Sequence, residues 1–351
     1  MRADDQSSGN EWFPDDSDEG ERATGDGESD EYDESSPDQQ ASDDPAVQAG
    51  ERNVAAWHPV AASSGYPPDS PSSASRPPPR MLPGDERAPL RILAVGDIFG
   101  GPGRDVARAM IPRLRRERSI DLVIANGENA AGGRGLTRST ADELFGAGID
   151  VLTLGNHTWS QREMETVLKD ETLPILRPLN YPPGVPGRGF LDLHVRGTRV
   201  RVVSLMGRVF MGESLDDAFR TMDDLLQITP DDAAVFVDFH AEATSEKVAM
   251  GWHLDGRVSA VWGTHTHVPT ADARILPSGT AFVTDLGMTG PQNSIIGSAV
   301  PQVLQRFLTG MPVRFTVATG PATFNAVIIE IDRRTRRGRG IWRRDHWDVV
   351  L

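Results

Sequence analysis

Five short polar clusters each follow an apolar, strand-like run of this chain. In chain order they are Gly96-Asp97, Gly127-Glu128-Asn129, Gly155-Asn156-His157, Phe239-His240 and Gly263-Thr264-His265-Thr266-His267. Their candidate side chains combine imidazole, carboxylate and amide donors, a mixture that suits Zn, Fe, Mn or Co and leaves room for solvent. The clusters therefore predict a metal centre.

This donor supply is large enough for two metal ions. Two cations about 3.5–4 Å apart can clamp the attacking and leaving oxygens of a phosphoryl displacement. A carboxylate that bridges the pair would offset much of their mutual repulsion. Water held between the ions loses its proton near neutral pH and becomes the nucleophile, and a nearby imidazole can protonate the leaving oxygen. The pattern is typical of a two-metal hydrolase.

Taken one at a time, the clusters have ordinary interpretations. Asp97 could be a helix cap, Glu128-Asn129 could be turn chemistry, and His240 could be a core histidine with satisfied hydrogen bonds. The pair His265 and His267 is more informative, since an H-x-H pair at a strand end can address two ions. The order of all five clusters, each at a strand exit, favours the metal site. By contrast, Gly132-Gly133-Arg134-Gly135 is interpreted as a plain loop and Arg104 as a solvated helix start.

The first half of the folded part alternates extended and helical patterns. Strands are predicted at 90–95, 121–125 and 151–154, and helices from about 104, at 139–145 and at 161–168, with Pro112 as a candidate kink. Such alternation indicates βαβ units with parallel strands. In an open α/β sheet, ligands bind outside the carboxyl ends of the strands. The clusters should therefore converge on one edge, helped by glycines that allow the backbone to approach closely.

The second half is richer in strands. The pattern predicts strands at 200–205, 233–239, 259–262, 280–284, 314–317 and 324–331, and helices at 215–226, 245–253 and 301–308. Two sheets packed face to face between helical layers would accommodate these elements. The predicted fold class is α/β.

Charge divides the 351-residue chain into two parts. Residues 1–90 carry 21 acidic and 6 basic side chains, which accounts for the whole formal charge of −15 and leaves the rest neutral. Residues 1–88, rich in Asp, Glu, Ser and Pro, are predicted to be a disordered acidic leader. Residues 89–351 are predicted to be the folded domain. A neutral body gives no electrostatic footprint for duplex nucleic acid.

Other composition features narrow the setting. The chain contains no cysteine, which excludes a disulfide framework and a thiolate metal site. No secretory signal or membrane-length apolar stretch is found. We therefore expect a cytoplasmic protein without a membrane partner, and the sequence leaves a homo-oligomer open.

Longer strings around the clusters resemble a known family. Asn126–Ala131, Leu176–Asn180, Asp238–Lys247 and Asp285–Gly290 are similar to the YmdB-like branch of the calcineurin-like metallophosphoesterases. The resemblance covers about residues 91–350. Relative to the wider superfamily, Asp97-Ile98-Phe99 lacks the usual histidine and Glu128 stands at the bridging aspartate position. Both departures fit this branch.

The resemblance implies a four-layer αββα sandwich and a phosphodiesterase acting on cyclic nucleotides, notably 2′,3′-cyclic AMP. It implies a dinuclear centre with iron or manganese, zinc remaining open. One metal would bind Asp97, Glu128, Asn129 and His267. The other would bind the bridging Glu128 together with Asn156, His240 and His265. The proton donor would be His157.

Two alternatives stay open at this point. The same ligands could serve a metal-dependent hydrolase of another ester or of an amide. The body could also be a non-catalytic protein that senses a metal or a nucleotide, with the acidic leader as its interaction arm. The small-molecule phosphodiester remains the leading substrate class.

Overall fold

The computed structural model describes residues 88–349. The predicted leader, residues 1–88, lies almost wholly outside the described residues, so its boundary with the folded domain stays a prediction. Among residues 88–349, no helix has both the length and the apolar character needed to cross a membrane.

Two six-stranded sheets form the centre of the fold. The first has the order β15-β14-β1-β3-β4-β5 and consists of β1 (Leu90–Val95), β3 (Leu122–Asn126), β4 (Val151–Thr153), β5 (Ile175–Leu176), β14 (Ala326–Ile331) and β15 (Gly338–Arg343). The second has the order β10-β11-β9-β8-β7-β6 and consists of β6 (Phe190–Val195), β7 (Thr198–Met206), β8 (Ala234–His240), β9 (Ala260–Thr264), β10 (Arg274–Ile275) and β11 (Ala281–Val283).

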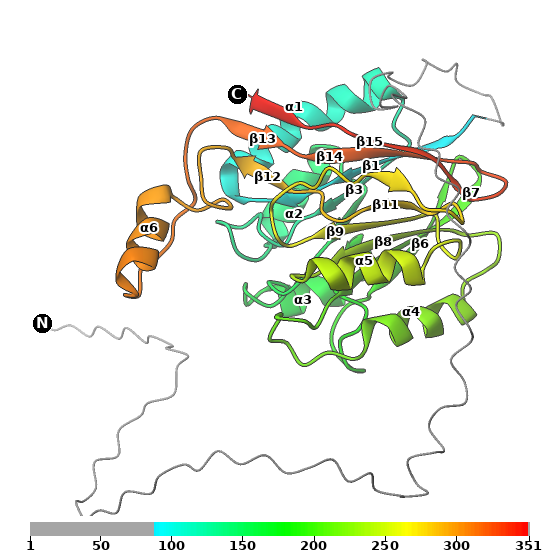
Figure 1. Cartoon of the computed structure of the whole chain (residues 1–351), viewed down its shortest axis with the longest axis horizontal. Helices are drawn as coiled ribbons and strands as arrows, with labels where there is room; N and C mark the ends of the chain where they lie inside the picture. The colour runs from blue at the N-terminus through cyan, green and yellow to red at the C-terminus, as the bar shows by residue number, and fades with distance from the viewer. Residues whose placement is uncertain (1–87, 350–351) are drawn as a thin grey trace, which may run out of the picture. The chain divides into compact units, whose positions relative to one another are not determined.

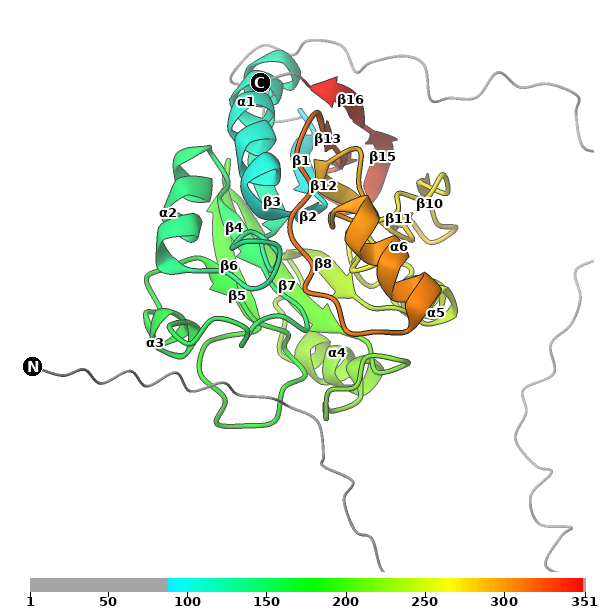
Figure 2. The ribbon, with the colours of Figure 1, turned by 90° about the vertical axis from the view of Figure 1, so that its left-hand side faces the viewer.

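Helices cover the outer face of each sheet, as Figure 1 shows for α1 on one side and α4 and α5 on the other. The first sheet packs against α1 (Gly100–Arg118), α2 (Arg138–Gly146) and α3 (Met164–Lys169). The second packs against α4 (Ala218–Gln227) and α5 (Thr244–His253). The remaining helix, α6 (Val300–Thr309), projects from this body (Figures 1 and 2).

Burial along β1 explains the layering. Ile92 and Ala94 pack with Val202 of the second sheet, whereas Leu93 and Val95 face the helices. Successive side chains of a strand point to opposite faces, so a strand buried on both faces is a continuous apolar run in the sequence. The predicted αββα sandwich is confirmed.

A small third sheet links the sandwich to the region of α6. It has the order β16-β13-β12-β2, formed by β2 (Asp97–Ile98), β12 (Met288–Pro291), β13 (Ala322–Phe324) and β16 (His346–Val349). The predicted strand 324–331 is wrong in one respect, because it is divided at Asn325 between β13 and β14. Asn325 donates to the Met288 carbonyl at 2.7 Å, where the chain passes from one sheet to another.

Other expectations need correction. Helix α1 begins at Gly100, earlier than predicted, and runs through Pro112. The predicted strand 314–317 is not a strand, since within the described residues it makes only the isolated bridge between Val317 and Ser298. The strands β6 and β15 were not predicted.

Candidate metal centre

The predicted ligand clusters lie at the carboxyl ends of parallel strands. Strands β1, β3 and β4 are parallel in the first sheet, and β7, β8 and β9 are parallel in the second. Asp97 follows β1 as the first residue of β2, Glu128, Asn129, Asn156 and His157 follow β3 and β4 of the first sheet, and the second sheet supplies His240, His265 and His267. The expected convergence is found between the two sheets.

His240 forms the middle of this convergence. Its Nε2 lies 3.0 Å from Oε1 of Glu128, 2.9 Å from Oδ1 of Asn156 and 3.1 Å from Nδ1 of His265. Ligand atoms of Glu128, His240 and His265 all lie within 4.8 Å of one another. Three acceptor atoms grouped around one ring nitrogen fit a shared cation.

The tautomer of His240 follows from its outer neighbours. Its Nδ1 lies 3.0 Å from Oγ1 of Thr264, and that hydroxyl donates to Asp238 at 2.7 Å. Because the hydroxyl proton is used on Asp238, the oxygen must accept from Nδ1–H of His240. Asn126 also lies near Nδ1, but at the longer distance of 3.4 Å. The lone pair of His240 is therefore on Nε2, facing Glu128.

The other two histidines are oriented in the same way. Nδ1 of His267 lies 2.9 Å from the Ile296 carbonyl, so it carries the proton and Nε2 faces Asp97 as a lone pair. Nε2 of His265 lies 3.0 Å from Oε2 of Glu242, which leaves the Nδ1 lone pair toward His240. A carboxylate or carbonyl on the outer nitrogen of a histidine is the usual support of a metal ligand. All three imidazoles thus turn a lone pair inward.

Two buried oxygens in the same place have unmet bonding capacity. Oδ1 of Asp97 and Oδ1 of Asn129 have no hydrogen-bond partner within residues 88–349. Nε2 of His267 lies 3.8 Å from Oδ1 of Asp97. Buried polar atoms are normally paired, and a cation bound by these atoms would satisfy them. The residues present therefore fit the expected metal ions.

The electrostatics of the centre favour bound positive charge. Burial raises the pKa of the Asp97 carboxyl well above its usual range, and Asp285 and Glu128 raise it further. Burial also raises the pKa of Glu128 and lowers that of His240 well below its usual range. Lys247 pairs with Asp285 at 2.6 Å and offsets one of the carboxylates. Bound cations would stabilise the ionised carboxylates of Asp97 and Glu128.

The backbone is strained where the ligands are presented. His265 and His267 have φ values of 97° and 65°, in a region that residues other than glycine seldom adopt. Gly155 is needed for a different reason, because a Cβ there would lie 2.2 Å from Cδ2 of His240. The backbone at Gly155 therefore approaches the His240 ring closely, as predicted from the sequence for the glycines of these clusters.

His157, the predicted proton donor, lies beside the same carboxylate. Its backbone N–H donates to Oε2 of Glu128 at 2.9 Å. Burial lowers the pKa of the His157 ring to about 4, although Glu128 acts in the opposite direction. In the free protein at neutral pH the ring is therefore uncharged.

The centre opens into a cleft of about 970 Å³. Its walls carry aromatic and cationic side chains, namely Phe99, Phe307, Phe315, Arg134, Arg306 and Arg314, in addition to His157, His265 and His267. The loop Gly132–Gly135, interpreted from the sequence as a plain loop, contributes Gly132, Gly133 and Arg134 to this wall. Arg104 instead pairs with Glu143 at 2.6 Å on the surface of α1.

Several supporting residues were missed by the sequence analysis. Asp238 and Thr264 hold His240, Glu242 holds His265, and the pair Lys247–Asp285 neutralises buried charge. The only signal was their position inside the motif strings, because nothing in their spacing indicates which ring nitrogen each would contact.

Comparison with known proteins identifies the class. A hypothetical protein from Thermus thermophilus, known from a crystal structure, is 48% identical, with a TM-score of 0.70 over 74% of this chain and 100% of that one. A structure described as a novel phosphatase from Mycoplasma pneumoniae is 32% identical, with a TM-score of 0.71 over 75% and 95%. Fold and relatives together define a metallophosphoesterase.

The family follows from the sequence matches. Residues 93–343 match the model of the YmdB-like proteins, and the chain belongs to this family. A Bacillus subtilis (strain 168) relative, named 2′,3′-cyclic-nucleotide 2′-phosphodiesterase, is 47% identical over 71% of this chain and 94% of its own length. The predicted family is confirmed, and its members' class implies divalent metal ions.

Proposed function

We propose that the protein is a dinuclear metal-dependent phosphodiesterase that hydrolyses cyclic nucleotides of the 2′,3′-cyclic AMP type. The observation that carries this proposal is the group of three imidazole lone pairs turned inward, in a site where Asp97 and Asn129 each keep a buried oxygen without a hydrogen-bond partner among residues 88–349. A donor set without thiolates is compatible with iron or manganese.

The ligand assignment follows the two groups of contacts. The 3.8 Å approach of Nε2 of His267 to Oδ1 of Asp97, together with the unpartnered oxygen of Asn129, supports a first site built from Asp97, Glu128, Asn129 and His267. Contacts around Nε2 of His240 favour a second site built from Glu128, Asn156, His240 and His265. Glu128 has one oxygen toward His240 and the other toward the backbone of His157, so it is the candidate bridge. When bound, the two cations would neutralise the phosphate and activate water.

His157 would deliver the proton to the leaving oxygen. In the free protein its pKa, lowered to about 4 by burial, leaves the ring neutral. An anionic phosphodiester placed beside the ring favours the charged form and raises this pKa. The imidazolium would therefore form as substrate binds, next to the oxygen that needs a proton.

The cleft supports a nucleotide as the substrate. Phe307 is exposed to 80% of its surface and lines the cleft together with Phe99 and Phe315, so aromatic faces are free to stack on a base. Arg134 and Arg306 line the same cleft and can neutralise phosphate oxygens. The name of the Bacillus subtilis relative points to the same substrate class.

The test is the initial rate of 2′,3′-cyclic AMP hydrolysis by manganese-loaded protein, with His240→Ala as the control. Turnover that disappears in His240→Ala supports the proposal. A protein that holds its metal ions yet leaves 2′,3′-cyclic AMP intact contradicts it. In that case, turnover of acyl substrates would select the other hydrolase, and tight nucleotide binding without turnover would select the sensor.

A further inference from the structure

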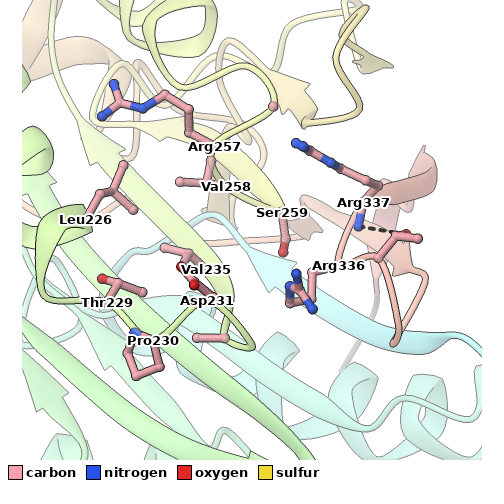
Figure 3. Close-up of a pocket in the computed structure, with 13 residues that line it drawn as sticks. Leu226, Thr229, Pro230, Asp231, Val235, Arg257, Val258, Ser259, Arg336 and Arg337 are labelled. Carbon is pink, nitrogen blue, oxygen red and sulfur yellow. Dashed lines mark hydrogen bonds between the residues drawn. The ribbon is translucent and has the colours of Figure 1, made fainter.

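A second cavity lies at the end of the second sheet that is remote from the metal centre. It has a volume of about 210 Å³ and is lined by the segments that lead into β8 and β9 and by the hairpin between β14 and β15 (Figure 3). The metal ligands follow the carboxyl ends of β8 and β9, whereas this cavity lies at their amino ends. Seven residues of β8 separate the two places, about 20 Å of extended chain.

Ser259, directly before β9, has a hydroxyl with unmet bonding capacity in this cavity. The residue is 1% exposed, and its Oγ has no hydrogen-bond partner among the described residues. Figure 3 shows the hydroxyl pointing toward the side chain of Arg336. A buried hydroxyl without a partner costs free energy, and a ligand oxygen in the cavity would remove that cost.

Two guanidinium groups of the hairpin line the same cavity without a carboxylate partner. Within residues 88–349, the guanidinium of Arg336 donates only to the Arg334 carbonyl in its own turn, at 3.0 Å, and that of Arg337 has no hydrogen bond or ion pair. The stem of Arg337 lies close to Gly279, where an added Cβ would be 3.0 Å from its Cδ. Two positive charges at one small cavity favour an anion between them.

The other charged residues of the lining do not cancel this pair. Arg257 points away from the cavity in Figure 3 and is paired with Asp223 at 2.7 Å. Asp231 also lines the cavity and is exposed to solvent, as Arg337 is, so it offsets one of the two positive charges and leaves a net positive charge. The net character of the cavity is therefore cationic.

We propose that this cavity binds a small organic phosphomonoester, with its phosphate between Arg336, Arg337 and the Ser259 hydroxyl. Guanidinium groups match phosphate oxygens in pairs, and a hydroxyl adds one further donor. Leu226, Pro230 and Val235 give the opposite wall an apolar surface suited to the organic part. The volume lies below the ~300–1,000 Å³ of pockets for drug-sized ligands, so a phosphorylated sugar is the right scale.

The test is a calorimetric titration of the full-length, metal-loaded protein with ribose 5-phosphate. We expect the double variant R336A/R337A to lose affinity at least tenfold. The control is Arg334→Ala, which removes one positive charge from the same hairpin but none from the cavity lining. Ribose 5-phosphate that binds at the metal centre would bind there equally in all variants. The test therefore rests on the differences in affinity between the variants.

Ser259→Ala distinguishes a loss of ligand binding from a loss of folding. Because it removes an unpartnered hydroxyl, the variant should bind ribose 5-phosphate several-fold more weakly and yet keep or raise its Tm without ligand. Equal affinities in wild type, R336A/R337A and Ser259→Ala would overturn the proposal. Inorganic phosphate binding as tightly as ribose 5-phosphate would overturn the organic part of it, since the apolar wall would then contribute nothing.

Discussion

Thr264 holds His240 through a single contact, with its hydroxyl 3.0 Å from Nδ1 of the ring. That hydroxyl gives its own proton to Asp238, whose pKa is raised by burial to about 6 and which is therefore ionised at neutral pH. The orientation of the ring and the position of its proton thus depend on a residue that never reaches the proposed metal ions.

Replacement of Thr264 by valine keeps the shape of the side chain and removes the acceptor. Nδ1–H of His240 would then lose its partner, and the affinity for Mn²⁺ should fall about 10–100-fold. Metal titration of the purified variant measures this effect. Thr264→Ser restores the hydroxyl and should recover most of the affinity. Unchanged Mn²⁺ binding in Thr264→Val would show that Thr264 does not support His240.

Replacement of His157 by alanine tests the proton donor. A missing general acid typically costs about 10²–10⁴ in rate, so turnover of 2′,3′-cyclic AMP should fall by that factor while Mn²⁺ content stays the same. A diester with a good leaving group, such as bis(4-nitrophenyl) phosphate, needs no proton and should lose far less. Equal losses on both substrates would argue against a donor at this position.

Metal affinity should depend on pH in an unusual range. Burial and neighbouring carboxylates raise the pKa of Asp97 well above its usual range, so its proton competes with the metal at higher pH than that of an ordinary carboxyl. We expect affinity for Mn²⁺ to begin to fall, as the pH is lowered, at a pH well above the usual carboxyl range, and a competing chelator measures this affinity. Asp97→Asn, which cannot titrate, should bind more weakly and with a flatter pH profile. A flat profile in the wild type would contradict the effect.

A fourth prediction concerns stability away from the site. The hydrogen bonds from Arg201, both at 2.7 Å, lower the pKa of Asp192. A carboxyl whose pKa is lower in the folded state stabilises that state above its unfolded pKa, and the contribution is lost as the pH falls through the folded value. Asp192→Asn should therefore reduce the free energy of unfolding by about 1 kcal/mol at pH 7, since Asp192 is partly exposed.

The same substitution should cost less at pH 3 than at pH 7, because pH 3 lies below the unfolded-state pKa and part of the contribution is already lost there. Thermal unfolding at both pH values measures the difference, with a Tm change of about 2 °C at pH 7. Asp224→Asn is the matched control, because Asp224 is exposed and has no ion pair within residues 88–349. An equal loss of Tm at both pH values would contradict the electrostatic explanation.

The sequence predicted the strand exits well because burial on both faces leaves a clear signal. β1 is apolar apart from Arg91 and β8 is apolar up to Asp238, and each ends at a polar cluster. β15 was not predicted because the two arginines and two glycines in Gly338–Arg343 interrupt the apolar pattern typical of a strand. β6 was missed as well, since its side chains are at most half-buried along an edge.

The sequence predicted which residues could be metal ligands, but not the contacts that orient them. Nothing in the spacing indicated that Glu242 would contact His265 or that Ile296, on the approach to α6, would orient His267. Such contacts depend on loops whose paths are set by packing between distant segments. The cleft wall formed by α6 was hidden for the same reason, because α6 was predicted as a helix without any indication of where it would lie.

The division of the donors between the two sheets constrains when the centre can be loaded during synthesis. Asp97 to His157 emerge from the ribosome early, but the histidines of the second sheet end at His267, and β14 of the first sheet follows only at Ala326–Ile331. With the ligands proposed above, the nascent chain lacks His265 and His267 until translation has passed β9. Metal capture is therefore a late event that marks a chain whose two halves have already docked.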